Sequence, residues 1–461
     1  MGKPDATAAQ GSRHRGRMDP KEPSAMTATE AAAAIRAGNL TSEILVQSCL
    51  ARIKSRDPAV EAWAHIDPGQ ALSDARAIDA ARRPAGPSKP LAGIPIAVKD
   101  LIDTADYPTE NGTPVFKGRR PQEDASVVAQ LKAAGAVILG KTVTTELAFF
   151  GPGKTKNPRN PDHTPGGSSS GSAAAVADFQ VPLALGTQTA GSIIRPASFC
   201  GTIGFKPTFG YVSRTGILPQ SAPLDTVGGY ARSVDDIALL IDAISAFDPR
   251  DHEMSSAPKP SLAHALRTSL PRPPRFAFVK SPAWPNADPE TQAAFEAFAS
   301  SLGGKAEIVE TALSPDFDGS LRLQQIVQFS DIARNYGPIA DKHPDVMSAK
   351  LKETIAEGRS FSSADYAAAR AARDPLYDEL RPILINYDAI LTPAAPGPAL
   401  RGLAGTGSPM FNALWTYLGM PCISLPLLEV TGLPLGVQLV GARGDDAGLL
   451  KVAKWLMEKA G

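Results

Sequence analysis

Hydrophobic positions recur along the chain with two different periods, and each period predicts one kind of element. Residues 27–82 carry Ala and Leu at helical spacing, which predicts helices, with Thr41 as the N-cap of one of them. Asp57-Pro58 is predicted to stop that helix, because the residue before a proline avoids the helical conformation. Helical spacing dominates again over residues 280–385.

Runs of apolar and β-branched residues that are too short for helices predict buried strands. One of them, 91–100, would carry Lys99 near its end. Another, 136–139, follows a predicted helix that Asp124 would cap and that Gly135 would end. The remaining predicted strands are 181–185, 389–393 and 421–426. A helix followed by a short buried strand is typical of a largely parallel sheet covered by helices, so we expect an α/β fold.

The chain is long for a single core. Its 461 residues suggest two or three domains on length alone, although large α/β enzymes can form one. Residues 1–24 are polar, basic and rich in Gly and Pro, and they lack the apolar centre of a secretory signal. We therefore predict a disordered N-terminal tail over these residues.

Composition and charge exclude several classes of protein. Lys plus Arg and Asp plus Glu both total 47, and this neutral balance argues against a nucleic-acid binder. No uncharged apolar run is long enough for a transmembrane helix, so no membrane partner is expected. The cysteines (Cys49, Cys200 and Cys422) are far apart, and the histidines form no metal-binding pattern. We therefore expect a cytoplasmic protein without a metal site.

Residues 135–142 match the phosphate-binding pattern GxxxxGK[ST] letter for letter, which makes a nucleotide-binding protein one alternative. In a phosphate-binding loop, the four middle residues form a turn whose N–H groups face the nucleotide. Here those residues are Ala, Val, Ile and Leu, which predict a buried strand instead. The context therefore argues against nucleotide binding.

A longer pattern lies in the Gly- and Ser-rich part of the chain. Residues 151–172 have the composition of a flexible linker, but predicted core elements flank them, which favours a functional loop. The segments Gly93-Ile-Pro-Ile-Ala-Val-Lys99, Pro165-Gly-Gly-Ser168, Gly186-Thr-Gln-Thr-Ala-Gly-Ser192, Leu224-Asp-Thr-Val-Gly228 and 432–441 follow in a characteristic order. This order resembles the signature of the amidase signature family, over residues 25–460.

The resemblance implies a fold, an activity and a set of catalytic residues. The implied fold is one large domain over residues 25–461, with a mixed, mainly parallel sheet covered by helices on both faces. Its signature core would span 90–245, and a more variable helical region would span 260–385. The implied activity is amide hydrolysis through an acyl-enzyme, without a cofactor. By position, Ser192 would be the nucleophile, Ser168, at a cis peptide, the bridging serine, and Lys99 the base.

The residues can support this chemistry. Amide hydrolysis needs a nucleophile, a base that returns a proton to the leaving amine, and donors for the developing oxyanion. Burial would keep Lys99 neutral, although pairing with Asp100 is the plainer interpretation of the residues alone. The predicted oxyanion donors are the backbone N–H groups of Thr189, Ala190, Gly191 and Ser192.

Two choices among neighbouring residues rest on the motif and not on chemistry. Chemistry does not rank Ser168 against the serines at positions 169, 170 and 172, and the motif alignment selects Ser168. His163 is the histidine nearest the motif, and we interpret it as a surface loop residue instead of a catalytic base.

Departures from the usual family pattern bear on the substrate. Many members have Asp where this chain has Gln188, and their Arg comes two residues after the nucleophile, whereas Arg195 is third. This pattern is similar to the malonamidase branch, in which the corresponding Arg holds a substrate carboxylate. We therefore predict that Arg195 and Gln188 bind substrate, and that the substrate is a small carboxamide bearing a carboxylate. A structural role for Arg195 beside Pro196 is the alternative.

Another function besides nucleotide binding stays open. The amidotransferase subunit that acts on misacylated tRNA shares the signature and would need partner subunits. The neutral charge balance and the departures at Gln188 and Arg195 argue against it. The predicted partner is a small-molecule amide, with no nucleic acid and no membrane, and a homodimer is left open.

Overall fold

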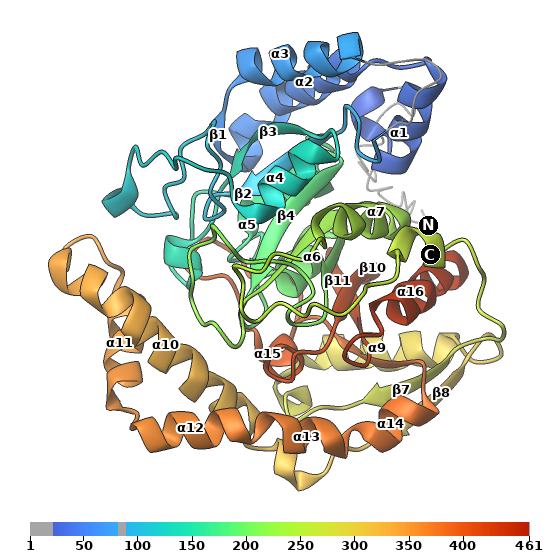
Figure 1. The fold of residues 1–461 in the computed structure, drawn as a ribbon. Coiled ribbons are helices and arrows are strands. Elements are labelled where there is room, and N and C mark those ends of the chain that lie inside the picture. The colour runs from blue at the N-terminus through green and yellow to red at the C-terminus, as the bar shows by residue number, and fades with distance from the viewer. Residues whose placement is uncertain (1–21, 82–88, 461) are drawn as a thin grey trace, which may run out of the picture.

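An eleven-stranded mixed sheet runs through the computed structural model, which describes residues 22–81 and 89–460 (Figure 1). Its strands lie in the order β1-β3-β2-β4-β6-β5-β10-β11-β9-β7-β8. The α/β class and the single mixed sheet are as predicted. The prediction that most pairs are parallel is wrong, because six of the ten pairings in the described residues are antiparallel. One antiparallel pair comes from the two-residue connection Thr431-Gly432, which joins β10 to β11 as only antiparallel strands can be joined.

The strands include all five that the apolar runs predict and several that they do not. Their bounds are β1 (Trp63–Ile66), β2 (Pro95–Lys99), β3 (Val137–Thr142), β4 (Leu183–Gln188), β5 (Ile203–Lys206), β6 (Thr226–Ala231), β7 (Arg275–Val279), β8 (Glu307–Thr311), β9 (Ala389–Pro393), β10 (Cys422–Val430) and β11 (Leu433–Val440). The strands β1 and β8 lie in stretches that were predicted to be helical. Both are edge strands, so each gains its pairing from a single neighbour that is distant in the sequence.

The helices differ from the predicted ones mainly at their ends. They are α1 (Ala28–Ala37), α2 (Ser42–Val60), α3 (Pro68–Ala81), α4 (Ser126–Ala133), α5 (Ser170–Ala177), α6 (Ile194–Cys200), α7 (Val234–Ile244), α8 (Leu262–Ala265), α9 (Pro289–Ser301), α10 (Ser320–Lys342), α11 (Ala349–Ser360), α12 (Ser363–Ala371), α13 (Arg373–Glu379), α14 (Arg381–Asn386), α15 (Met410–Tyr417) and α16 (Asp446–Ala460). Thr41 caps α2 as predicted, but α2 continues through Pro58 because that proline lies in its last turn. Asp124 does not cap α4; its carboxylate binds Lys132 and the N–H of Ala105.

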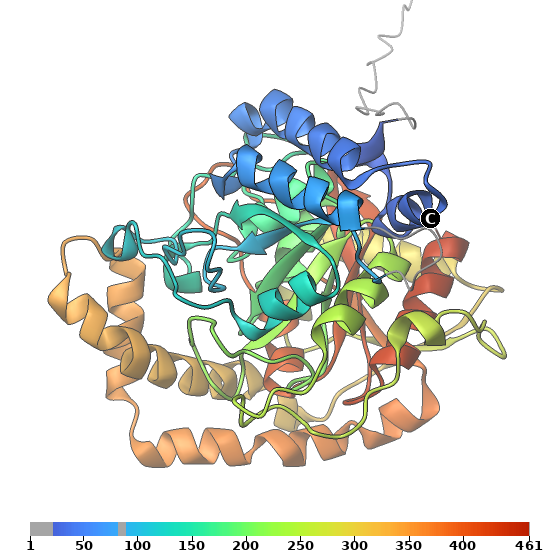
Figure 2. The same cartoon turned by 45° about the horizontal axis from the view of Figure 1, so that its top comes forward.

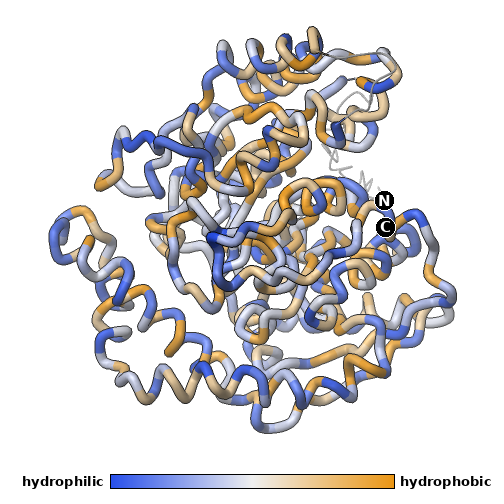
Figure 3. Tube along the Cα trace, in the orientation of Figure 1, coloured by the Kyte–Doolittle hydropathy of each residue, from blue (hydrophilic) through white to orange (hydrophobic). Residues whose placement is uncertain are grey.

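Helices cover both faces of the sheet, as predicted. Adjacent residues of a strand point to opposite faces, and β6 has two adjacent glycines that show this. A Cβ at Gly228 would contact Ile193, next to α6, whereas a Cβ at Gly229 would contact Leu240 of α7. Figure 3 shows hydrophobic residues concentrated in the central strands and in the helices that cover them.

The helices α10–α14 form a band along one side of the sheet (Figures 1 and 2). This band corresponds to most of the region predicted to be variable and helical, 260–385, although β7 and β8 also belong to that region and extend the sheet. None of the described helices is both long enough and apolar enough to cross a bilayer.

The predicted disordered tail, 1–24, lies mostly outside the described residues. Its last residues are ordered, because Pro23–Ala25 form a 3-10 turn and the N–H of Ser24 donates to Ser48 Oγ at 3.0 Å. Residues 22–24 therefore belong to the described fold.

Candidate active site

The carboxyl ends of three neighbouring strands meet at one edge of the sheet. Strands β3, β2 and β4 are parallel, and Lys99, the last residue of β2, pairs in register with Thr142 of β3. Strand β4 ends at Gln188 and continues directly into residues 189–192. Because parallel strands end at the same edge, this topology brings Lys99 close to the segment that carries Ser192.

Lys99 is completely buried, and its amine contacts two hydroxyl groups. Its Nζ lies 2.8 Å from Ser168 Oγ and 2.9 Å from Thr187 Oγ1. Burial lowers the pKa of Lys99 well below its ordinary value, and the negative charge of Asp225 opposes part of this shift. Burial therefore favours the neutral amine, which can accept a proton from Ser168.

The geometry also distinguishes Ser168 from the serines beside it. Its peptide bond with Gly167 is cis, and its hydroxyl alone among these serines reaches Lys99. Ser169 and Ser170 bond to backbone carbonyls of Thr187 and Val143, and Ser172 bonds to the carbonyl of Leu185. His163, interpreted above as a loop residue, lies in a loop, where its backbone forms an isolated antiparallel β-bridge with that of Arg401.

Ser168 and Ser192 line the same cavity, which has a volume of about 460 Å³. Ser192 is half-buried, and Ser168 is 4 % exposed. In the described residues, the backbone N–H groups of 189–192 donate to no protein acceptor. A turn whose N–H groups are free beside a serine can supply hydrogen bonds to an oxyanion formed at that serine.

Gln188 lies beneath this turn and not in the cavity. Its Oε1 accepts from the N–H groups of Ile193 and Ile194 at 2.7 and 3.0 Å, and its Nε2 donates to Thr416 Oγ1 at 2.9 Å. The side chain is fully buried, and both its oxygen and its nitrogen are hydrogen-bonded. Gln188 is therefore not among the residues that line the cavity, and its amide fixes the backbone that follows Ser192; its contact with substrate stays a prediction.

Arg195 does reach the cavity, and it has no acidic partner among the described residues. Its Nε donates to the carbonyl of Thr406 at 2.7 Å, and its Nη2 donates to the carbonyl of Gly167 at 2.7 Å. Its Nη1 is buried without any partner in this part of the chain. Burial lowers the pKa of Arg195 to about 10, so the guanidinium remains charged at neutral pH. A buried cation with a free N–H donor can bind an anionic group of a ligand.

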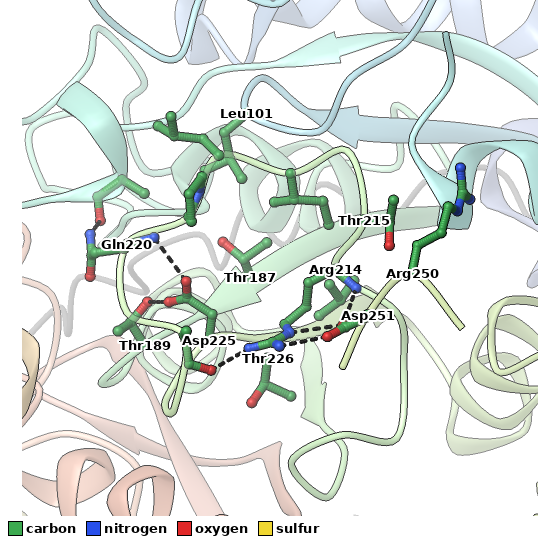
Figure 4. Close-up of a pocket in the computed structure, with 16 residues that line it drawn as sticks. Leu101, Thr187, Thr189, Arg214, Thr215, Gln220, Asp225, Thr226, Arg250 and Asp251 are labelled. Carbon is green, nitrogen blue, oxygen red and sulfur yellow. Dashed lines mark hydrogen bonds and ion pairs between the residues drawn. The ribbon is translucent and has the colours of Figure 1, made fainter. Parts of the chain in front are cut away.

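Asp225 is a residue of the site that the sequence analysis did not single out. Its Oδ1 accepts from Thr189 Oγ1 at 2.5 Å, and its Oδ2 accepts from the N–H groups of Gln220 and Ser221 at 2.8 and 2.9 Å (Figure 4). Burial raises the pKa of Asp225, and these hydrogen bonds oppose the rise. The carboxylate lines a second, smaller cavity of about 190 Å³ that also includes Thr187. Asp225 therefore links the turn 189–192 to the segment 220–225.

Three glutamines extend this link to α10. Gln324 Nε2 donates to the carbonyl of Thr189 at 3.4 Å and to Gln328 Oε1 at 2.9 Å. Gln328 Nε2 in turn donates to Gln220 Oε1 at 2.8 Å. We refer to Gln324, Gln328 and Gln220 as the glutamine chain. It ties the helix that lines the cavity to both ends of the contact between Thr189 and Asp225.

The phosphate-binding pattern at 135–142 is not a loop in the structure. Residues 137–142 form β3, and Gly135 (φ +90°) follows the end of α4, as the sequence context predicted. Lys141 is fully buried, and its Nζ lies 2.8 Å from the carbonyl of Ile102 and 3.5 Å from Asp100. The pattern therefore forms a buried strand with an engaged lysine and not a phosphate-binding loop, which argues against the nucleotide-binding alternative. No cluster of three metal-ligating side chains occurs within 22–81 and 89–460.

Comparisons with known proteins show which chains and folds this protein resembles. The family model described as Amidase matches residues 44–450. A glutamyl-tRNA(Gln) amidotransferase subunit from Chloroflexus aurantiacus is 34 % identical over 471 residues, which cover 93 % of this chain and 95 % of that protein. The structure of the peptide amidase from Stenotrophomonas maltophilia superposes with a TM-score of 0.80 at 28 % identity, covering 94 % of this chain and 97 % of that one. A structure of a vestigial protein complex, described for the origins of an s-triazine catabolic enzyme, superposes with a TM-score of 0.86 at 30 % identity, covering 94 % and 98 %.

Proposed function

The chain belongs to the amidase family of enzymes, which act on amide C–N bonds, and from this premise we propose that it hydrolyses small carboxamides bearing a carboxylate. The reaction would pass through an acyl ester on Ser192. The observation that carries the proposal is Arg195, which lines the cavity together with Ser168 and Ser192 and whose Nη1 is buried without a partner in the described residues.

In the proposed reaction, neutral Lys99 accepts the proton of Ser168 while Ser168 accepts the proton of Ser192. Ser192 Oγ bonds to the carbonyl carbon, and the N–H groups of 189–192 stabilise the oxyanion. When the C–N bond breaks, the proton returns through Ser168 to the nitrogen, so ammonia or a neutral amine leaves. Water then attacks the ester, gives its proton to the same relay, and releases the carboxylic acid and free Ser192.

The carboxylate preference follows from the surroundings of Arg195. Burying a guanidinium without a carboxylate partner raises the free energy of the folded protein. Here backbone carbonyls accept hydrogen bonds only from Nε and Nη2. A substrate carboxylate would supply the missing charge and accept from Nη1. It would also lie close to the turn, because a Cβ at Gly191 would be 3.1 Å from Nη1.

The test compares Arg195→Ala with the native chain on two kinds of substrate. The first are half-amides, which are dicarboxylic acids with one carboxyl group converted to an amide, and the second are neutral amides of the same length. Losing a buried charge pair costs about 2–5 kcal/mol, so we expect kcat/KM for half-amides to fall on the order of 30- to 5,000-fold, with a much smaller fall for neutral amides. Equal losses on both substrates would contradict the proposal.

Two control variants accompany this test. Arg159→Ala removes an exposed arginine that bonds to the carbonyls of Cys200 and Gly201, outside the cavity, and should leave both activities unchanged. Ser192→Ala should abolish turnover of both kinds of substrate. Full turnover by Ser192→Ala would show that the acyl ester does not form at that residue.

A second candidate is a subunit of a tRNA-dependent amidotransferase. The named relative from Chloroflexus aurantiacus favours it, because the match extends over nearly the whole of both chains. Such a subunit would release ammonia from an amide donor for use by partner subunits. The isolated chain would then hydrolyse glutamine better than any half-amide. Parallel kinetics with glutamine and with half-amides of malonic and succinic acid separate the two candidates.

A further inference from the structure

The cavity that contains Ser192 is larger than a minimal half-amide requires. Its volume, about 460 Å³, lies within the range in which pockets enclose drug-sized ligands. Ser168, Ser192 and Arg195 form only part of its lining. A half-amide of malonic acid would contact these residues and leave most of the cavity to water.

The rest of the lining includes a continuous aromatic wall. Phe149 and Phe150 follow the 3-10 turn Glu146–Ala148, and Phe329 projects from α10. The ring of Phe149 packs edge-to-face on Phe150, with centroids 4.8 Å apart, and on Phe329, with centroids 6.2 Å apart. Phe150 and Phe329 are only half-buried, so ring surface remains available to a ligand. We call Phe149, Phe150 and Phe329 the aromatic wall.

The aromatic wall and Arg195 belong to different parts of the fold. Arg195 lies on α6 and is held by Thr406, in the loop before α15. Its free Nη1 is beside Gly191, so a carboxylate bound there is separated from the reacting carbonyl by a short spacer. The acyl part of the substrate is therefore small, and the remaining space in the cavity is available to the amine part.

We propose that the preferred substrate carries an aromatic or similarly large apolar group on its leaving amine, which packs against the aromatic wall while the carboxylate binds Arg195. This inference rests on the function proposed above and adds the chemical class of the leaving group. Aromatic groups pack favourably edge-to-face on phenylalanine rings, and burying one removes a large apolar area from water. A primary amide or an N-methyl amide would gain neither contribution.

The test measures kcat/KM for matched N-benzyl and N-methyl half-amides of malonic and succinic acid, by release of the amine. Both leaving groups are alkyl amines, so their comparison reports mainly on binding of the ring. Burial of a phenyl group predicts that the N-benzyl substrate is better by roughly 10- to 100-fold. An N-methyl substrate that is as good as the N-benzyl one, on a chain that hydrolyses both, overturns the aromatic subsite and leaves the proposed function intact.

Variants of the aromatic wall connect this preference to named residues. Phe329→Ala should bring the ratio of the two kcat/KM values close to one, and Phe329→Leu should retain part of it. Because both substrates are measured on one preparation, the ratio does not depend on the fraction of folded protein. Phe247→Ala, which removes a ring that is 51 % exposed outside the cavity, should keep the native ratio. An unchanged ratio in Phe329→Ala contradicts the proposal.

Two further results would overturn part or all of the proposal. A preference for a benzyl group on the acyl carbon, in place of the nitrogen, would overturn the assignment of the ring to the leaving amine. Failure of the native chain to hydrolyse any half-amide would overturn the proposed function itself, and the subsite proposal with it.

Discussion

The contact between Asp225 and Thr189, in the turn 189–192, leads to a prediction about both rate and pH dependence. Replacing Asp225 by Asn keeps the size of the side chain but removes its charge. The native carboxylate accepts one hydrogen bond from Thr189 and two from backbone N–H groups. An amide can keep both contacts only by accepting from the two backbone N–H groups and donating to the Thr189 hydroxyl, so the Asp225→Asn variant loses the hydrogen bond that Thr189 donates to a charged oxygen.

The magnitude follows from the bonds that are lost. A hydrogen bond to a charged group contributes about 1.5–3 kcal/mol. If this energy serves to hold the turn in place, kcat should fall roughly 10- to 150-fold, with a smaller change in KM. Thr189→Val removes the same contact from the other side, so we expect a decrease in kcat within the same range.

The two variants differ in their expected effect on the acidic limb of the pH–rate profile. In the proposed mechanism activity requires neutral Lys99, so we expect it to rise as pH increases through the pKa of that amine. The negative charge of Asp225 favours protonated Lys99 and so holds the pKa of the amine higher than burial alone would. Asp225→Asn therefore lowers the pKa of Lys99 further, and the acidic limb moves to lower pH. Thr189→Val keeps the carboxylate and should not move the limb in that direction.

The assay is kcat/KM measured from pH 5 to 9 on one half-amide, with thermal unfolding recorded for each variant. A limb that stays in place in Asp225→Asn would refute the electrostatic part of the reasoning. Undiminished kcat in Thr189→Val would refute the positioning part.

Three further substitutions test other contacts. In Gly191→Ala the new Cβ would lie 2.5 Å from Asn412 Oδ1, so the turn must shift, and we expect kcat to fall on the order of 100-fold in steady-state assays. Gln188→Leu leaves two buried N–H groups without an acceptor and should lower the free energy of unfolding by about 2–6 kcal/mol in urea denaturation. Lys141→Met leaves Asp100 buried without its cation and should lower that free energy by about 3–5 kcal/mol, whereas calorimetry with ATP should show no binding to either protein.

The residues that we propose as catalytic could be singled out from the sequence because their signal is local. Lys99 ends a short apolar run, and Ser168 and Ser192 belong to a contiguous motif whose order along the chain is distinctive. The same locality explains the strands that were predicted, since β2, β3 and β4 are each a single apolar run. In the structure, these strands bring Lys99 and Ser168 within hydrogen-bonding distance.

The features of the site and of the fold that the sequence did not predict depend on contacts between segments that are distant in the chain. Asp225 meets Thr189 across 36 positions, and Gln324 meets it across 135, so neither pairing has a signature in the local pattern. Gln188 departs from the usual family pattern, but the local sequence does not indicate where its side chain points. In the structure the side chain is buried and does not line the cavity. Strand β8 has the burial pattern of an exposed edge, and only its pairing with β7 makes it a strand.

The glutamine chain has a consequence for the redesign of this enzyme. Helix α10 lines the cavity, and yet its Gln324 and Gln328 also bond, directly or through Gln220, to the segments that hold Thr189 in place. Helix α10 and the turn 189–192 are therefore structurally coupled, and neither can be replaced without regard to the other. A graft that exchanges α10–α14 for the corresponding part of a relative would retain the catalytic geometry only if it carried matching amides at those two positions.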